Sequence, residues 1–362
     1  MRQLTEGKAA IHVPRQRVDR TAEAFYNPAM EYHRDITMSA LRVFSRELGR
    51  GISVCDPLAG TGVRSVRMAL EVPAIARITA NDMSTKAFRI MKMNIEENGI
   101  NAEVLNKNAN ELFLEHPRAF DFIDIDPFGS PVNYIHNAAY ALKPKSVLAV
   151  TATDTGALCG SFPSTCFARY GIRNWKTDFY KETGARVLAT SVMMQLARHD
   201  MAFEPLYAHA NHYFRVIGHV RRSKSAVTKQ AKSICFVSYC QKCLYRETGL
   251  KDKCPECGGG LKHMGPVWTG SMIDRGFAGK MLEDLRRSGY KNTKELWTAL
   301  SEIDEPFYYD MHRMFKVLGK TPKKTNECIR GLEAAGFKAS RTHFSGTGLK
   351  TNAPYRELIK RL

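Results

Sequence analysis

Strands and helices alternate along the first half of the chain, and this alternation limits the possible folds more than any other feature. The sequence predicts short apolar strands, most of them separated by helical patterns, at 52–55, 75–80, 102–105, 120–125 and 145–151. Repeated strand–helix units form a parallel sheet with right-handed crossover connections. Two closely spaced strands, 203–210 and 212–220, favour an antiparallel hairpin. We therefore predict an α/β fold with one sheet spanning residues 50–222.

One strand of this predicted sheet ends on a carboxylate. Residues 120–125 have the pattern of a buried strand, and Asp126-Pro127 ends it, because Pro127 has no N–H to donate to a neighbouring strand. A turn then leads to a predicted helix at 131–142. Open α/β sheets bind ligands at the carboxyl ends of their strands, which makes Asp126 a candidate catalytic residue. The alternative is a structural aspartate that caps the next helix.

The sequence Asp126-Pro127-Phe128-Gly129 suits a planar ring that carries an amino group. The carboxylate and the carbonyl of Asp126 or Pro127 can accept hydrogen bonds from both hydrogens of an exocyclic amine. Phe128 can stack on the ring. We therefore expect Asp126, Pro127 and Phe128 to form a catalytic clamp on a nucleobase.

The turn at 56–62, which follows the first strand, is rich in glycine but is not a phosphate-binding loop. It lacks the Gly-Lys-Ser/Thr that holds phosphates and magnesium, and Ser65 replaces the third glycine of a dinucleotide motif. Asp56, Gly60 and Gly62 are better suited to a smaller ligand, because glycines let the backbone approach a nucleoside closely.

The next two strands also end on polar side chains. Asp82 follows the second strand, where a carboxylate can accept from both hydroxyls of a ribose. Asn108 and Ala109 follow the third strand and can meet the edge of an adenine. These strand ends should line one crevice, with Asp126 as the next neighbour.

Together these positions fit S-adenosylmethionine beside a base that carries an amine. The cofactor brings its own activated methyl, so catalysis reduces to positioning and electrostatics. An Asp126 carboxylate that accepts an N–H bond would localise the amine lone pair and stabilise the developing ammonium. Arg34 is a candidate for bidentate pairing with the cofactor carboxylate, and Arg64 is a second. The alternative for each arginine is a surface ion pair.

Four cysteines form two Cys-x2-Cys pairs separated by ten residues, at Cys240, Cys243, Cys254 and Cys257. This spacing is typical of a closed tetrahedral zinc site, whereas the alternative is four free thiols in a loop. With no vacant coordination position, the zinc would be structural. We predict a zinc ribbon at 233–262.

Charge and cysteine content indicate the kind of partner and the compartment. The net charge is +18, and residues 311–362 hold 12 Lys/Arg against 3 Asp/Glu, which favours a nucleic acid partner over a merely basic surface. No run of 18 apolar residues exists, and the first twenty residues lack the apolar segment of a signal peptide. The nine cysteines indicate a reducing compartment. We expect a cytoplasmic monomer without a membrane partner.

Composition and pattern predict three parts. Residues 1–30 are expected to be a basic, irregular N-terminal segment, and 31–222 the sheet domain. Residues 223–362 are expected to be a nucleic-acid-binding C-terminal domain, which ends in a winged-helix-like module at 306–362. Residues 221–232 carry five basic residues and no acid, and we interpret them as a linker or a phosphate-contacting strand.

The sequence resembles one family along nearly its whole length, the archaeal type of tRNA guanine-26 N2-dimethyltransferases. The matching motifs are Phe25-Tyr26-Asn27-Pro28, His33-Arg34-Asp35, Gly62-Val63-Arg64, Asn81-Asp82, Asp126-Pro127-Phe128-Gly129-Ser130-Pro131, Thr151-Ala152-Thr153-Asp154, His212-Tyr213-Phe214-Arg215, Gly265-Pro266-Val267-Trp268, Arg341-Thr342-His343-Phe344 and Thr347-Gly348-Leu349-Lys350-Thr351. Generic methyltransferases share only the glycine turn and an Asp-Pro-Pro-like motif.

The resemblance implies a Rossmann-like class I methyltransferase sheet and a C-terminal domain particular to the family. It implies transfer of one or two methyls from S-adenosylmethionine to guanine N2 of tRNA at the junction of the D and anticodon stems. Because a paired guanine is out of line with a deep crevice, we predict that the base is extruded. The alternatives are an RNA or DNA amino-methyltransferase with another target, and a non-catalytic RNA-binding protein.

The resemblance also assigns roles to single residues. It makes Asp126 catalytic, places Phe25 and Phe128 on either side of the base, and lines the cofactor site with Arg34, Arg64, Asp82 and Ala109. The chain departs from the family at Asn108, where members carry an acid. An amide can still accept from the adenine amine, so we expect weaker recognition there.

Overall fold

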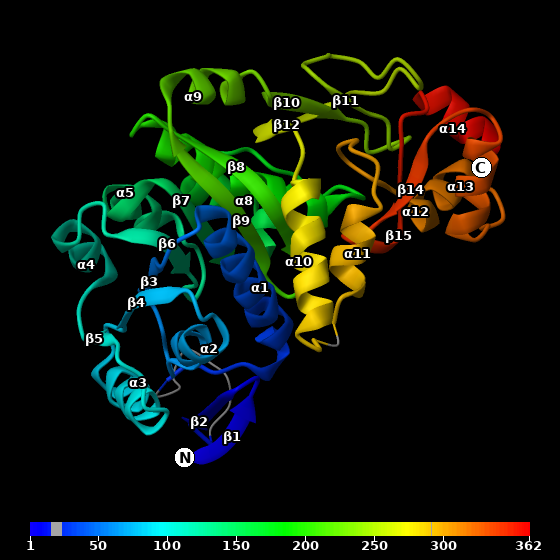
Figure 1. Ribbon diagram of the computed structural model, residues 1–362. Coiled ribbons are helices and arrows are strands. Elements are labelled where there is room, and N and C mark those ends of the chain that lie inside the picture. The colour runs from blue at the N-terminus through cyan, green and yellow to red at the C-terminus, as the bar shows by residue number, and fades with distance from the viewer. Residues whose placement is uncertain (16–23, 291) are drawn as a thin grey trace.

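A seven-stranded mixed sheet forms the centre of the molecule, in the computed structural model that describes residues 1–15, 24–290 and 292–362 (Figure 1). Its strand order is β5-β4-β3-β6-β7-β9-β8. The strands are β3 (Ile52–Asp56), β4 (Ile75–Asn81), β5 (Glu103–Leu105), β6 (Phe120–Ile125), β7 (Leu142–Ala152), β8 (Met201–Ala210) and β9 (Phe214–Arg222). The predicted strand–helix alternation and the hairpin after it are confirmed.

Five of the strands are parallel, and the hairpin β8–β9 closes one edge of the sheet. Strand β6 pairs with β3 on one side and β7 on the other, both parallel, whereas β9 runs antiparallel to β7. The carboxyl ends of β3, β4 and β6 therefore lie at the same edge, as a doubly wound sheet requires.

Helices cover both faces of the sheet because successive side chains of β6 enter opposite cores. Ile123 and Ile125 belong to the core that also contains α4 (Ala109–Glu115), α5 (Val132–Ala141) and α8 (Tyr180–Ala197). Phe122 belongs to the opposite core. The helices of that core are α1 (Glu31–Leu48), α2 (Val63–Glu71), α10 (Arg275–Arg287) and α11 (Lys294–Leu300). All six residues of β6 are buried, which explains its near-continuous apolar pattern.

The expectation of an irregular N-terminal segment is wrong for its first residues. Strands β1 (Arg2–Glu6) and β2 (Ala9–Val13) form an antiparallel hairpin, and Gly7 at the turn has a φ of +56°. Alternate residues of β2 point into a small core that also contains Met91 of α3 (Thr85–Glu97). The alternation of apolar and polar residues that predicts a strand was present in the sequence, but the basic residues around it made the segment look irregular. Residues 16–23 lie outside the described residues.

The interpretation of 221–232 as a linker or strand is also wrong. Strand β9 continues to Arg222, and residues Lys224–Ala231 form helix α9. Ser223 caps this helix, because its hydroxyl accepts a hydrogen bond from the N–H of Ala226 at 3.3 Å. Ser223 is a common type of N-cap residue, so this signal was available in the sequence.

The C-terminal part contains two further three-stranded sheets, β11-β10-β12 and β13-β15-β14. Their strands are β10 (Ile234–Tyr239), β11 (Arg246–Thr248), β12 (Lys262–Trp268), β13 (Tyr309–Asp310), β14 (Ala339–Thr342) and β15 (Ser345–Thr351). The remaining helices are η1 (Pro28–Met30), α6 (Thr155–Leu158), α7 (Pro163–Tyr170), α12 (Met311–Leu318), α13 (Thr325–Glu333) and α14 (Tyr355–Arg361).

The last sheet and helices α12–α14 lie at the opposite end of the molecule from the hairpin β1–β2 (Figure 1). They supply the helices and the strands expected of a winged-helix-like module, whose relation to that fold stays a prediction. One continuous apolar core joins these elements to the central sheet, so the domain boundary at 222/223 also stays a prediction. None of the helices in the described part of the chain is long and apolar enough to cross a membrane.

Candidate active site and metal site

A cavity of about 340 Å³ lies at the carboxyl ends of the central strands. Among the residues that line it are six predicted from the sequence, Phe25, Gly60, Asp82, Asp126, Pro127 and Phe128. An adjoining, much smaller cavity of about 20 Å³ shares Phe25, Leu58 and Asp126 with the first. Three further predicted residues, Arg34, Asp56 and Arg64, line this smaller cavity. The structure thus brings most of the predicted site together.

The Asp126 carboxylate is nearly buried but borders both cavities. Its side chain is 9% exposed and accepts a short hydrogen bond through Oδ2 from Nη2 of Arg64. The same oxygen lies 3.7 Å from Nδ1 of His33, a fully buried residue. Asp126 is therefore part of an ion pair and still faces the space in which a ligand would lie.

Two buried carboxylates share the charge of Arg64. Its Nη1 lies 2.7 Å from Oδ2 of Asp124, and Arg215 donates to that same oxygen at 2.6 Å. Burial raises the pKa of Asp126 above its usual value, and Asp124 adds to that rise, although Arg64 opposes both. In this structure Arg64 therefore holds Asp126 in place, and its predicted contact with a cofactor stays a prediction.

Arg34 is held by a carboxylate that the sequence reasoning missed. Its Nε donates to Oε1 of Glu6 at 2.6 Å and its Nη2 to Oε2 at 2.5 Å. Tyr26 also donates to Glu6, at 3.0 Å. Both Arg34 and Glu6 have side chains that are 3% exposed. The N-terminal hairpin thus fixes one wall of the smaller cavity, and the alternation of β1 was the signal that pointed Glu6 inward.

Gly60 and Asp82 are joined by a hydrogen bond at the edge of the main cavity. The N–H of Gly60 donates to Oδ2 of Asp82 at 2.9 Å, and the N–H of Ser84 donates to Oδ1 at 2.9 Å. Gly60 has a φ of +56°, and a Cβ there would lie 2.9 Å from the carbonyl oxygen of Phe25. Glycine is therefore required for the turn to approach Phe25 so closely.

Three predicted cofactor residues do not line either cavity. Gly62 has a φ of +77° and packs beside Met91. Asn108 is exposed and caps α4, since its Oδ1 accepts from the N–H of Asn110 at 2.9 Å. Ala109 is the buried first residue of that helix. An Asn before a helix is a common N-cap, and this role accounts for Asn108 in the structure.

The two predicted base-stacking residues touch each other. The rings of Phe25 and Phe128 meet edge to face with centroids 4.7 Å apart, and Phe128 is 48% exposed. The N–H of Gly129 donates to Oγ1 of Thr153 at 2.6 Å, and the N–H of Thr153 donates back to the Gly129 carbonyl at 2.9 Å. The end of β7 therefore braces the Asp-Pro-Phe-Gly turn, and Thr153, which sequence reasoning missed, also lines the cavity.

The main cavity has the size and polarity of a site for a nucleoside-type cofactor. Its volume lies within the range of about 300–1,000 Å³ typical of small-molecule sites. Asp82 places a carboxylate at the end of β4, where such sheets bind ribose. The remaining lining is mostly apolar, with Leu58, Met83 and Tyr134 among it. The residues present therefore fit S-adenosylmethionine.

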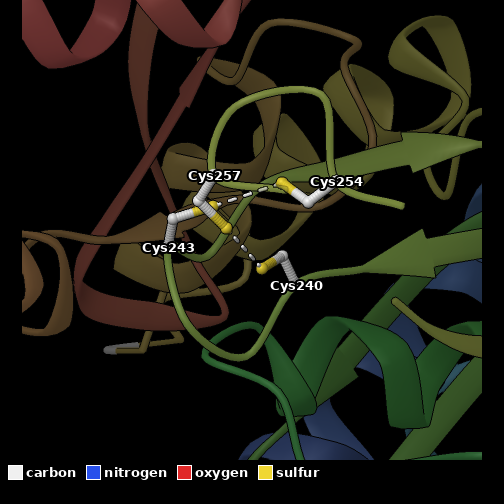
Figure 2. A group of neighbouring side chains, drawn as sticks. All are labelled: Cys240, Cys243, Cys254 and Cys257. Atoms are coloured by element: carbon white, nitrogen blue, oxygen red, sulfur yellow. Dashed lines mark hydrogen bonds between the residues drawn. The ribbon is translucent and has the colours of Figure 1, made fainter. Parts of the chain in front are cut away.

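The four cysteines of the predicted zinc site converge, as Figure 2 shows. All four Sγ atoms lie within 4.8 Å of one another, with Cys240–Cys257 and Cys243–Cys254 each at 3.5 Å. A tetrahedral site with Zn–S bonds of about 2.3 Å requires sulfurs about 3.8 Å apart. The geometry therefore suits a structural Cys₄ zinc ion, as the spacing predicted.

Comparison with known proteins places this site in context. Residues 7–362 match the family described as N2,N2-dimethylguanosine tRNA methyltransferase. A tRNA (guanine(26)-N(2))-dimethyltransferase from Methanothermobacter thermautotrophicus is 37% identical, covering 98% of this chain and 97% of the relative. A tRNA (guanine(26)-N(2)/guanine(27)-N(2))-dimethyltransferase from Aquifex aeolicus is 34% identical, covering 99% and 95%. The structure of Trm1 from Pyrococcus horikoshii with S-adenosyl-L-methionine superimposes with a TM-score of 0.89, at 29% identity, over 100% of this chain and 99% of the other.

Proposed function

Because the chain belongs to the family of N2,N2-dimethylguanosine tRNA methyltransferases, we propose that it methylates the exocyclic N2 of guanine 26 in tRNA, with S-adenosylmethionine as methyl donor. The observation that carries this function is the full-length match to relatives of that activity, combined with a cavity that has Asp126 on its wall. The basic residues of 311–362 are the proposed contacts to tRNA phosphates. We propose that the protein acts as a cytoplasmic monomer.

S-adenosylmethionine supplies an electrophilic methyl group on its sulfonium centre. Asp126 accepts a hydrogen bond from one N2–H of the guanine, which localises the amine lone pair and directs it at the methyl carbon. Transfer would form the N–C bond and break the methyl–sulfur bond, with S-adenosylhomocysteine as the leaving group. The Asp126 carboxylate would stabilise the positive charge on the nitrogen and then take its proton. The elevated pKa of Asp126 makes it a better proton acceptor than an exposed aspartate.

Other residues of the site position the two substrates. Asp82 is the proposed ligand of the ribose hydroxyls, and Phe128, whose ring is half exposed, is the proposed stacking partner of the base. Arg34 is the proposed partner of the cofactor carboxylate. Because its Nε and Nη2 donate to Glu6, Arg34 would approach the ligand with Nη1. A guanine paired within a stem must be extruded to reach Asp126.

Replacement of guanine 26 by adenine in tRNA transcripts tests the proposed target. Methyl incorporation from labelled S-adenosylmethionine should fall to background, because adenine has no N2 amine. The unmodified transcript of the same tRNA is the control. Retained incorporation would favour the alternative, an enzyme that methylates another base or position.

A further inference from the structure

A second cavity, of about 570 Å³, lies away from the proposed active site. It is formed where the start of α1, the β8–β9 turn, the start of α11 and the β14–β15 hairpin meet. These segments are far apart in the chain, and α11 contacts β14 at this junction. The lining residues used below are Tyr32, Asn211, Lys294, Glu295 and Arg341.

This cavity is distinct from the first but close to it. The two share no lining residue. Between Asp126 and the second cavity lies a buried layer of rings, in which His33 contacts Tyr213 and His209 with centroids 5.2 and 6.3 Å apart. Nδ1 of His33 lies 3.7 Å from Asp126, and Nδ1 of His209 lies 3.4 Å from Glu295. One layer of side chains therefore separates the two cavities.

Glu295 is a charged acceptor on the wall of this cavity. Its side chain is 27% exposed, and its Oε1 is buried, 3.4 Å from Nδ1 of His209. Burial raises the pKa of this carboxyl, but nearby His209 and His343 outweigh burial and hold the pKa below its usual value. An ionised carboxylate that is partly exposed on a cavity wall can accept charge-assisted hydrogen bonds from a ligand.

Two cations lie beside this carboxylate. Arg341 is oriented by the hairpin, since its Nε donates to Oδ1 of Asn326 at 2.8 Å and its Nη1 to the carbonyl of Gly346 at 3.1 Å. Lys294 precedes Glu295 and is exposed. The oriented guanidinium of Arg341 and the flexible, exposed ammonium of Lys294 can together bind a phosphate group at the cavity.

Tyr32 offers an aromatic surface whose position is fixed. Its hydroxyl lies 3.1 Å from that of Tyr207, a buried residue, and its own side chain is partly exposed to the cavity. A ring held at its hydroxyl end would lose little further side-chain entropy on contact with a base. Such rings are the usual stacking partners of unpaired bases.

We propose that this cavity binds a second, unpaired guanine nucleotide of the substrate tRNA. The inference rests on the proposed function. Guanine presents N1–H and N2–H side by side, which one carboxylate can accept as a pair, whereas adenine, cytosine and uracil have no two adjacent donors on that edge. Glu295 reads this edge, Tyr32 stacks on the base, and Arg341 with Lys294 binds the adjoining phosphate.

The test replaces single guanines of a tRNA transcript, other than guanine 26, by inosine, which lacks only the N2 amine. With the wild-type protein, replacement at one position should raise KM for tRNA by roughly tenfold, the effect of one lost base contact, and leave kcat unchanged. Glu295→Gln should raise KM by a similar factor and should make that same inosine substitution silent. Glu283→Gln, the same change at an exposed residue of α10, is the matched control.

Two outcomes would overturn the proposal. One is that no inosine substitution affects KM in the wild-type protein, a result that does not depend on how any variant folds. The other is that guanosine monophosphate binds in a Glu295-dependent manner while every inosine transcript behaves normally, which would assign the cavity to a free nucleotide. The same assays measure methyl transfer to guanine 26. Absence of that transfer would contradict the proposed function, whereas normal transfer without any inosine effect would contradict only the proposed second binding site.

Discussion

Asp126→Ala is expected to lower kcat for methyl transfer by about 10²–10⁴-fold, the usual contribution of a positioned proton acceptor. The carboxylate is the group placed to accept an N–H bond in the main cavity and to stabilise the positive nitrogen. The affinity for tRNA should change little, because the proposed phosphate contacts lie in residues 311–362 and the proposed second base contact lies at Glu295.

Single-turnover rates with saturating tRNA and cofactor would measure this effect, with tRNA affinity measured separately by filter binding. The fold should survive, because Arg64 keeps its partner Asp124 at 2.7 Å after Asp126 is removed. Asp304→Ala, the same change at an exposed residue, is the matched control and should leave kcat unchanged. A variant that transfers methyl normally, or one that loses tRNA binding instead, would contradict the catalytic role of Asp126.

Cys254→Ser is expected to cost more stability than any effect it has on chemistry. It removes one of four proposed zinc ligands, and the binding energy of a structural zinc ion is folding energy. The site also anchors the C-terminal helix, because Tyr355 donates to the carbonyl of Cys243 and Arg356 pairs with Glu256 at 3.0 Å. Loss of about 3 kcal/mol would lower the Tm of a chain of this length by roughly 4 °C.

Thermal denaturation followed by circular dichroism, with zinc content measured by mass spectrometry, checks this expectation. The wild-type protein should contain one zinc ion per chain at this site. Cys235→Ser is the matched control, because Cys235 lies in the adjoining strand β10 but outside the cluster of four sulfurs. A wild-type protein without zinc, together with an unchanged Tm in Cys254→Ser, would refute the structural site.

The features that the sequence predicted well are those that depend on residues close together in the chain. The strand at 120–125, the turn that carries Asp126 and the two Cys-x2-Cys pairs all follow from spacing alone. Two elements were wrongly predicted, the hairpin β1–β2 and helix α9, although both have local signals among their basic residues.

The features that the sequence did not reveal depend on pairing between distant residues. Glu6 binds Arg34 across 28 positions, and Arg64 bridges two carboxylates about 60 positions away. The residues next to an arginine in the sequence do not show which carboxylate it will pair with. Arg34 and Arg64 were expected to bind the cofactor, and the structure holds both in buried ion pairs. The second cavity has the same origin, because four separate segments create it.

Identification of the methylated nucleoside shows whether the protein transfers methyl groups to guanine N2. A tRNA transcript with guanine at position 26 is incubated with the protein and S-adenosylmethionine, digested to nucleosides and separated by liquid chromatography with mass detection. N2-methylguanosine and N2,N2-dimethylguanosine are expected with the wild-type protein, and neither is expected with Asp126→Ala. A methyl group found on a ring nitrogen, on the ribose or on another base would contradict this expectation.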